Sequence, residues 1–326
     1  GNKIARRLDV SDLGKGRLHR GVAQAAFDVM TDADGCAARD RLHLRNACDD
    51  ALSIGRDIDH PPVARRPNIE HCSDVPVVDP LEELGLPMIM KDLVMIKRGL
   101  VLMVGATGSG KSTSLAAMLN FRNETSSDHI LTVEDPIEFL HRNKKSIVNQ
   151  REVGLDTRSF HRALRSAMRA APDVILIGEI RDRESMEYAL TFAGTGHLCL
   201  ATLHANNAAE TLDRIINMFP RDQHSQIFLD LSQYLKAILS QRLVMGKDGK
   251  RVAALEVLLN TPHVQELIKK GDVIGVKESL IRSSEKGVQS FDIALYELFK
   301  QGKVTLEEAI SNADSRTNLE AKINFG

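Results

Sequence analysis

Short continuous apolar runs recur along residues 75 to about 210, and stretches of helical composition separate them. Each run is too short for a helix and ends in turn-forming or polar residues, which is typical of strands buried on both faces. Strands that alternate with helices predict a parallel sheet wrapped by helices. The predicted strands are Leu100–Val104, His129–Val133, Ser146–Gln150, Asp173–Ile177 and His197–Leu203. The predicted helices are a lead-in over Leu81–Lys97, then Thr113–Asn120, a segment around 158–169, and Arg183–Phe192.

The pattern becomes mostly helical after Asn207, and one predicted strand, Val252–Leu259, interrupts it. The segment Gln265–Leu319 predicts four or five short amphipathic helices, because Gly271, Gly287 and Gly302 break the helical periodicity. The sequence therefore predicts an α/β core over 75–245, followed by a smaller subdomain of one strand and helices over 246–326.

Residues 1–74 differ in composition from the rest of the chain. Phe27 is their only aromatic residue, and through residue 80 arginine outnumbers lysine ten to two, against sixteen to fifteen beyond it. Neither a period of 2 nor one of 3.6 is sustained there. This stretch of unclear fold stays unassigned. It is either a small, weakly patterned domain or not a native domain, for example through an altered reading frame, and composition does not decide between the two.

Composition narrows the class of protein. A chain of 326 residues has room for two domains, and a net charge of −1 gives no bulk basic field, so no nucleic-acid partner is expected. Neither a membrane span nor a secretory signal is visible. The cysteines form no C-x-x-C pair, which argues against a zinc ribbon or a disulfide scaffold and favours the cytoplasm. Cys199, in the middle of a predicted strand, is expected to be a small core residue.

The segment Gly105–Ser112 (GATGSGKS) lies between a predicted strand and a predicted helix, the context in which GxxxxGK[ST] indicates a phosphate-binding loop. Its glycines let the backbone approach phosphates and aim successive N–H groups into one anion-binding concavity. Lys111 would reach the β- and γ-phosphates of ATP, and Ser112 would hold Mg²⁺. A chance glycine-rich turn is the other interpretation, which the flanking strand and helix disfavour. The predicted nucleotide-binding residues are Gly105, Ala106, Thr107, Gly108, Ser109, Gly110, Lys111, Ser112 and Thr113.

Acidic residues follow two of the predicted strands. Glu134, Asp135 and Glu138 come after His129–Val133, and Glu179 comes after the buried strand of residues 173–177. The carboxyl ends of strands form the ligand edge of an open α/β sheet. A carboxylate there is costly unless it acts on a metal or on water. For Glu179, the alternative is a structural salt bridge to a neighbouring arginine, either Arg181 or Arg183.

Four arginines follow each other at spacings of four, three and four residues, which places them on one side of a predicted helix. Such a stripe is either a solvated face or a surface that meets another subunit or a phosphate, and both interpretations stay open. The four are Arg158, Arg162, Arg165 and Arg169.

Four motifs together resemble the signatures of the secretion ATPase superfamily, which are the Walker A, Asp box, Walker B and His box. Here they read GATGSGKST (105–113), TVEDPIEF (132–139), DVILIGEIRD (173–182) and TGHLCLATLHANNA (195–208). From about residue 75 to 326 the chain is similar to the PilT/PilU retraction ATPases of type IV pili. The wording LCLATLHANNA and LEVLLNTP (255–262) is closer to the PilU branch than to the PilT branch.

The resemblance implies a RecA-like core that works as a cytoplasmic ring peripheral to the inner membrane and couples ATP hydrolysis to pilus disassembly. It implies ATP and Mg²⁺ as cofactors, and a PilT-type paralogue and the pilus inner-membrane platform protein as partners. Glu179 would polarise the attacking water, and His204 would sense the γ-phosphate, with His197 supporting the same segment. The expected catalytic residues are therefore Glu179, Glu134, Glu138 and His204, and the expected contacts of nucleotide-bound Mg²⁺ are Ser112 and Asp135.

Two departures from the family pattern affect these expectations. Family members carry an N-terminal PAS-like domain whose arginines reach the nucleotide of a neighbouring subunit. Residues 1–74 do not align with it, so no such arginine is assigned here, and a homo-hexamer is expected only with a family-type N-terminal domain. PilT proteins also carry an AIRNLIRE helix needed for retraction. At the matching positions, 263–270, this chain has HVQELIKK, which keeps the apolar residues and lacks the arginines.

Two alternatives to a retraction motor stay open. One is an accessory ring subunit that binds nucleotide yet depends on a PilT-type partner. The other is a different secretion-superfamily ATPase. Many pilus-extension and type II secretion ATPases carry a four-cysteine zinc insertion, and the lack of cysteine after Cys199 argues against them. Conjugation-type ATPases match the Asp-box wording less well.

Overall fold

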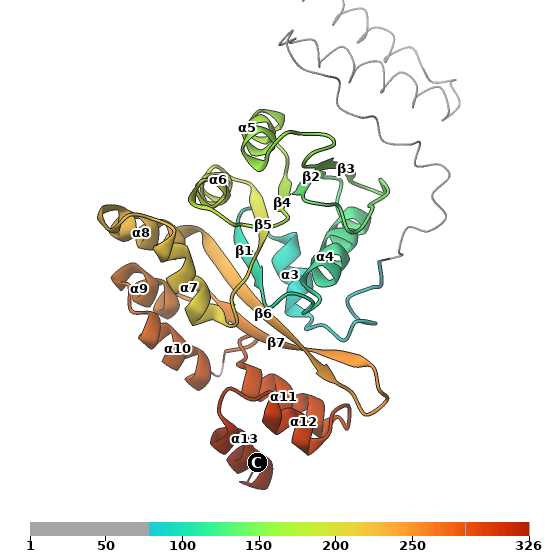
Figure 1. Ribbon diagram of the computed structural model, residues 1–326, viewed down its shortest axis with the longest axis vertical. Coiled ribbons are helices and arrows are strands. Elements are labelled where there is room, and N and C mark those ends of the chain that lie inside the picture. The colour runs from blue at the N-terminus through green and yellow to red at the C-terminus, as the bar shows by residue number, and fades with distance from the viewer. Residues whose placement is uncertain (1–77, 284, 326) are drawn as a thin grey trace, which may run out of the picture. The chain divides into compact units, whose positions relative to one another are not determined.

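One mostly parallel sheet organises the molecule (Figure 1). The structure is a computed structural model that describes residues 78–283 and 285–325, and the predictions about residues 1–74 lie outside the described residues. The strand order is β3-β2-β4-β5-β1-β6-β7, and all neighbours are parallel except β6 and β7. The strands are β1 (Gly99–Val104), β2 (His129–Glu134), β3 (Ile147–Glu152), β4 (Val174–Ile177), β5 (Leu198–Leu203), β6 (Leu235–Met245) and β7 (Arg251–Leu259). This sheet wrapped by helices confirms the predicted fold class.

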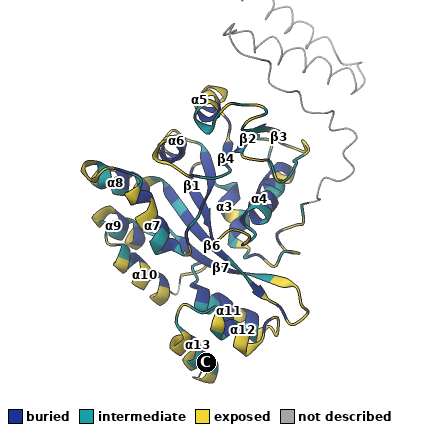
Figure 2. Cartoon of the chain, viewed as in Figure 1, coloured by how far each residue is buried: buried dark blue, intermediate teal, exposed yellow. Residues whose placement is uncertain are grey.

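Helices cover both faces of the sheet, and the central strands are buried on both sides (Figure 2). Alternate residues of β1 belong to two separate hydrophobic clusters, one formed with α3 and α4 and the other with α5 to α10. This explains why β1 is apolar at every position rather than at every second one. The helices around the sheet are α3 (Ile89–Met95), α4 (Lys111–Thr125), α5 (Phe160–Ala170), α6 (Arg183–Gly194), α7 (Ala208–Asn217), the short 3₁₀ turn η3 (Arg221–Gln223), α8 (His224–Tyr234), α9 (Pro262–Lys270) and α10 (Val273–Arg282).

A third hydrophobic cluster joins the last helices to the far end of the β6–β7 hairpin. Phe291 and Leu295 are fully buried there against Val244 and Ala254. The helices are α11 (Phe291–Lys300), α12 (Leu306–Ser311) and α13 (Arg316–Phe325). With α9 and α10 they make five helices in the described residues after β7, within the predicted number, and Gly271, Gly287 and Gly302 lie between them at positive φ.

Two of the predicted elements are wrong. The helical lead-in over Leu81–Lys97 shrinks to α3, because residues 81–85 form a turn and Pro87 follows. The segment after Asn207 contains a second strand, β6, where only helix was expected. No glycine or proline marks the point where α8 ends and β6 begins, and β6 is buried between β1 and β7, so its apolar residues do not alternate.

The predicted boundary between 245 and 246 falls in the turn of the β6–β7 hairpin. Because β7 pairs with β6 along its whole length, we propose that the core extends through Leu259 and that the helical subdomain begins at α9.

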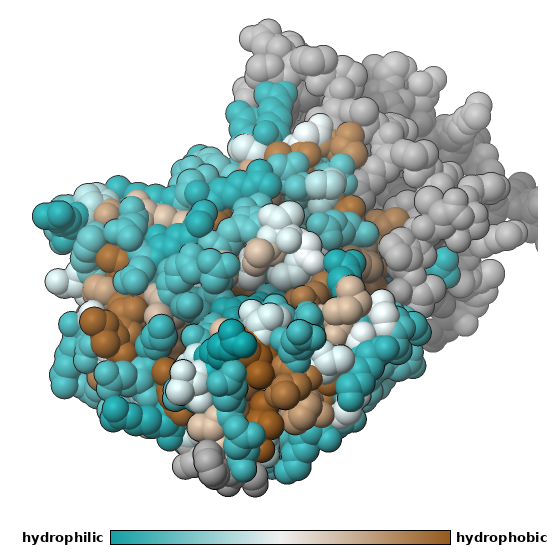
Figure 3. All heavy atoms as spheres, turned by 60° about the horizontal axis from the view of Figure 1, so that its bottom comes forward, coloured by the Kyte–Doolittle hydropathy of each residue, from teal (hydrophilic) through white to brown (hydrophobic). Residues whose placement is uncertain are grey.

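Figure 3 shows the face of the molecule that carries α11 to α13. Hydrophilic residues cover most of this face, and hydrophobic residues form patches between them. Within the part of the chain that the structure describes, no helix has the length and apolar content needed to cross a membrane.

Candidate nucleotide-binding site

The glycine-rich loop connects β1, in the middle of the sheet, to the start of α4. Gly105, Gly108 and Gly110 have φ angles of 153°, 76° and 84°, a region that side chains disfavour. A Cβ on Gly105 would also lie 2.5 Å from the Gln241 carbonyl oxygen. The loop shape therefore depends on glycine, as the sequence pattern predicts.

The N-terminus of α4 differs from those of α5, α6 and α7. Those helices begin at Ser159, Asp182 and Asn207, whose side chains accept a hydrogen bond from the first turn. α4 follows Gly110, which supplies no side-chain cap. Its first N–H groups are thus not occupied by a capping side chain, which suits a helix end that binds an anion.

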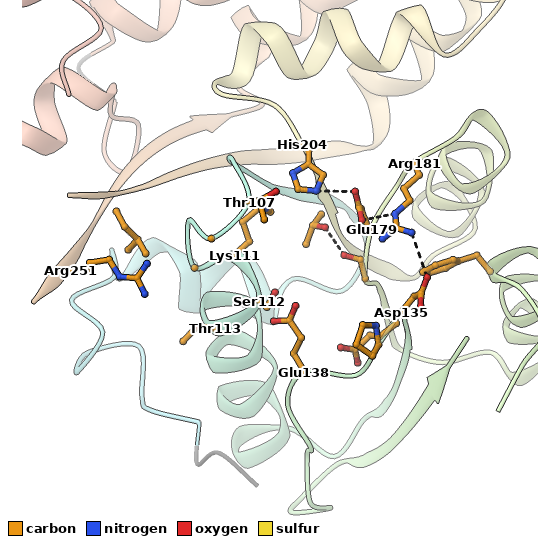
Figure 4. A pocket seen from close by; sticks show the side chains of 18 residues that line it. Thr107, Lys111, Ser112, Thr113, Asp135, Glu138, Glu179, Arg181, His204 and Arg251 are labelled. Carbon is orange, nitrogen blue, oxygen red and sulfur yellow. Dashed lines mark hydrogen bonds and ion pairs between the residues drawn. The ribbon is translucent and has the colours of Figure 1, made fainter. Parts of the chain in front are cut away.

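Lys111 is buried at 8% exposure, and its Nζ donates to the carbonyl oxygens of Gly105 (2.9 Å) and Ala106 (2.8 Å). Burial lowers the pKa of Lys111, and the nearby carboxylates of Glu179 and Glu138 partly offset that change. The cation is thus held over its own loop, facing acidic groups across the cavity (Figure 4).

Glu179 follows β4 and lies at the centre of a small polar network (Figure 4). Its Oε1 is 3.0 Å from His204 Nε2, and its Oε2 accepts a 2.6 Å hydrogen bond from Arg181 Nε. Arg181 also approaches Asp135, at 3.5 Å. The salt bridge to Arg181 considered for Glu179 therefore exists, and it does not remove Glu179 from the cavity, because all four residues line it.

Of the predicted acidic residues, Glu134 is the last residue of β2, and Asp135 and Glu138 follow it. Glu134 accepts hydrogen bonds from Thr132 Oγ1 (2.6 Å) and Gln150 Nε2 (3.3 Å), and burial raises its pKa. Glu138 and Asp135 line the same cavity, and Glu138 projects towards Ser112 in Figure 4.

A cavity of about 570 Å³ collects most of the predicted residues at the carboxyl ends of β1, β2, β4 and β5. Gly105, Ala106 and Ser109 do not line it; they line a neighbouring cavity that shares Thr107 and Gly108 with the main one. The predicted residues that line the main cavity are Thr107, Gly108, Gly110, Lys111, Ser112, Thr113, Glu134, Asp135, Glu138, Glu179 and His204.

The cavity also has lining residues that the motifs did not indicate, among them Leu243 and Arg251. Both belong to the β6–β7 hairpin, and the missed strand β6 hid their proximity to the loop. Arg251 is exposed, and it is a cation at the cavity edge in addition to Lys111 and Arg181. Phe160, from the start of α5, adds an aromatic ring.

Three other predicted features lie away from the cavity. His197 precedes β5, whereas His204 follows it, so His197 does not support the His204 segment; its ring packs edge-on against Phe192. Cys199 is fully buried in the core as expected. The four arginines of the stripe are exposed and line no part of the main cavity, which argues against a phosphate-facing role at this site.

A divalent metal would need the nucleotide to complete its ligands. Among the residues that the structure describes, no group of three or more His, Cys, Asp or Glu side chains could hold a metal ion. Ser112 supplies a hydroxyl oxygen and the acidic segment supplies carboxylates on the same cavity. Mg²⁺ prefers such oxygen ligands and commonly binds through one or two of them together with phosphates, so the residues fit Mg²⁺ carried by a nucleotide.

Comparison with known families matches residues 87–250 to the Type II/IV secretion system protein family, which is half of the chain. The chain belongs to this family. The matched segment contains the loop, the acidic segment, Glu179 and His204, so the cavity described above is a feature of the family segment.

Two relatives from Pseudomonas aeruginosa are similar to this Type II/IV secretion system family member. The type IV pilus ATPase PilU is 58% identical over 247 residues, which is 76% of this chain and 65% of PilU. The retraction ATPase PilT is 46% identical over 73% of this chain and 70% of PilT. The crystal structure of the pilus retraction motor PilT with bound ADP superposes with a TM-score of 0.71 at 44% identity, over 76% of this chain and 70% of that one. The chain thus spans about two-thirds of the length of PilU and PilT.

Proposed function

We propose that this protein is an ATP-hydrolysing motor of type IV pilus retraction, which couples hydrolysis to pilus disassembly. The observation that carries the proposal is the convergence of the glycine-rich loop, Glu179 and His204 on one cavity. The similarity to PilU and to ADP-bound PilT supports a nucleotide as the ligand of that cavity.

In this proposal the loop and the start of α4 bind the phosphates. The backbone N–H groups of residues 108–113 supply the concavity, and Lys111 exchanges its carbonyl partners for phosphate oxygens. Ser112 and Asp135 would hold the Mg²⁺ that accompanies ATP, which would supply positive charge beside the phosphates. Arg251 lines the same cavity as the loop and adds a positive charge at the edge of the nucleotide.

Glu179 polarises the attacking water. Each of its carboxylate oxygens has one partner, His204 or Arg181, which leaves acceptor capacity on both oxygens for a water molecule. The two partners also fix the carboxylate in one orientation, and orientation of the nucleophile is the main task in phosphoryl transfer. His204 reports on the γ-phosphate through its 3.0 Å contact with Glu179.

The acidic segment after β2 supports this chemistry. The two hydrogen bonds to Glu134 and its raised pKa suit a fixed positioning group. Glu138, which projects towards Ser112 in Figure 4, suits a role beside the metal and the water.

The proposed working form is a cytoplasmic homo-hexameric ring at the inner membrane, which forms when a family-type N-terminal domain is present. It contacts the pilus platform protein and a PilT-type paralogue, without nucleic acid. The similarity to the pilus retraction motor PilT supports a head-to-tail assembly, which closes when the rotation between subunits permits it.

An accessory ring subunit that depends on a PilT-type partner is the second candidate. It is favoured by α9, which has the half-buried Gln265 and the exposed Lys269 at the two positions where PilT proteins have the arginines of the retraction helix.

A steady-state ATPase assay distinguishes the two candidates. The full chain is measured alone and with a PilT-type paralogue whose own phosphate-binding lysine is replaced, so that all turnover comes from this chain. A motor hydrolyses ATP alone, slowly while it is unassembled, whereas an accessory subunit shows turnover only in the mixture. Absence of turnover and of ATP binding under both conditions would contradict the proposed function.

A further inference from the structure

Gln241 joins the phosphate-binding loop to β6. It is 2% exposed and lies one position beyond the last residue of β6 that pairs with β1, where Ser240 faces Val104. Its side-chain amide bridges two segments: Nε2 donates to the Ser109 carbonyl oxygen, and Oε1 accepts from Ser114 Oγ, each at 2.7 Å. One buried side chain thus contacts both the loop and the first turn of α4.

The geometry allows only one orientation of this amide. If it were flipped, its oxygen would face the oxygen of the Ser109 carbonyl, two acceptors without a hydrogen between them. The contact is also close on both sides: a Cβ on Gly110 would lie 2.8 Å from Gln241 Nε2, and one on Gly105 2.5 Å from Gln241 O. The loop is therefore held directly against this residue.

A fixed carbonyl at Ser109 also fixes the next N–H group. In a planar trans peptide, the C=O of one residue and the N–H of the next point in opposite directions. Because the Ser109 carbonyl is turned to Gln241, the Gly110 N–H is turned away from it, towards the side where Gly110 lines the main cavity.

We propose that Gln241 is a positioning residue for phosphate binding, which orients the Gly110 amide by fixing the Ser109 carbonyl. This inference rests on the proposed nucleotide-binding function. Gln241 itself does not line the main cavity, so its effect on the ligand is exerted through the loop.

The test compares Gln241→Met, which keeps the length and removes both hydrogen bonds, with Gln289→Met. Gln289 is the control, because its Nε2 donates a 2.8 Å hydrogen bond to the carbonyl of Leu255, the β7 residue that pairs with Gln241, and not to the loop. For the full-length chain we measure Mg-ADP affinity by titration of a fluorescent ADP analogue, amide hydrogen exchange of the peptide covering 105–113 without nucleotide, and thermal melting. Gln241→Met is expected to bind about tenfold more weakly, the effect of an unpaired buried group, and to exchange faster in this peptide. Gln289→Met is expected to match the parent in both.

Equal affinity and equal exchange in Gln241→Met and the parent would overturn the inference while leaving the proposed function intact. Faster exchange in a protein whose parent binds no nucleotide would support the loop contact and contradict the proposed function. If Gln241→Met does not fold, Ser114→Ala decides. It removes only the bond to Oε1 and is expected to weaken ADP binding about threefold, and unchanged binding would overturn the inference.

Discussion

Within the described part of the chain, buried Lys111 donates hydrogen bonds to two carbonyl oxygens of its own loop. Lys111→Ala removes a buried cation at a ligand edge, so we expect the loss of most ATP affinity and of all hydrolysis, while the fold survives. Nucleotide titration and circular dichroism check the two parts. Hydrolysis by the variant at the parent rate would show that this loop is not the phosphate site.

The two partners of Glu179 allow binding to be separated from chemistry. Glu179→Gln keeps size and hydrogen bonding but weakens the polarisation of water, so turnover should fall by about 10² or more while ATP binding persists. Glu187→Gln is the matched control, since Glu187 forms a 2.6 Å ion pair with Arg183 on the exposed face of α6. If Glu179→Gln abolished binding instead, Glu179 would be a structural or metal anchor, and Glu134 or Glu138 would become the catalytic candidate.

At the residue scale, the sequence predicted those members of the cavity that follow a motif. A glycine-rich loop, or a carboxylate after a buried strand, has a local physical reason that is readable from neighbouring residues. Arg251 has none: it enters the cavity only because an antiparallel hairpin returns it there. His197 is the reverse case: it is close to His204 in the sequence, but β5 separates the two histidines in space.

At the scale of elements, Arg242 connects β6 to the C-terminal helices. It donates to the Asn312 carbonyl (3.0 Å), pairs with Asp314 (2.7 Å), and its guanidinium lies 3.8 Å from the centre of the Phe291 ring. Arg242→Met should lower the free energy of unfolding by about 1–3 kcal/mol, because partly buried charged partners lose their hydrogen bonds.

Urea unfolding and limited proteolysis of α11 to α13 measure that effect. Arg282→Met is the control, because Arg282 makes only a 3.5 Å ion pair and its side chain is 79% exposed. Equal stability of the two variants would show that Arg242 does not fasten the C-terminal helices.

The elements that the sequence predicted are those whose ends are marked by capping residues or by glycine. Helices that begin at Ser159, Asp182 and Asn207 have capping residues, and the glycines after β7 separate its helices. No capping residue, glycine or proline marks the start of β6. One of its partners, β1, lies far earlier in the chain, and the other, β7, comes after it. Local pattern does not contain that information, so this strand could be found only from the tertiary structure.

At the scale of the whole molecule, assembly and turnover are expected to be linked. The described cations of the cavity are Lys111, Arg181 and Arg251, and Arg181 is already paired with Glu179 and Asp135. Arginines from a neighbouring subunit contribute up to about 10³–10⁵ in rate in other nucleotide hydrolases. We expect this chain to bind Mg-ATP, to hydrolyse it poorly and to stay largely monomeric at micromolar concentration.

Light scattering and an ATPase assay on the same preparation measure both properties. A family-type N-terminal domain placed ahead of Val75 should raise assembly and turnover together. A stable hexamer with high turnover from the chain as it stands would contradict this prediction.

The central place of β1 has a consequence for the synthesis of the protein. β1 ends at Val104, but one of its two neighbours, β6, begins only at Leu235. At the usual speed of translation the ribosome needs on the order of ten seconds to produce the residues between them. The other neighbour, β5, begins only at Leu198, so both edges of this entirely apolar strand are unpaired until β5 is made, and one edge stays unpaired until β6 follows. Such an edge is a surface that chaperones bind and through which nascent chains aggregate. The loop can therefore reach its final shape only after the β6–β7 hairpin has left the ribosomal tunnel.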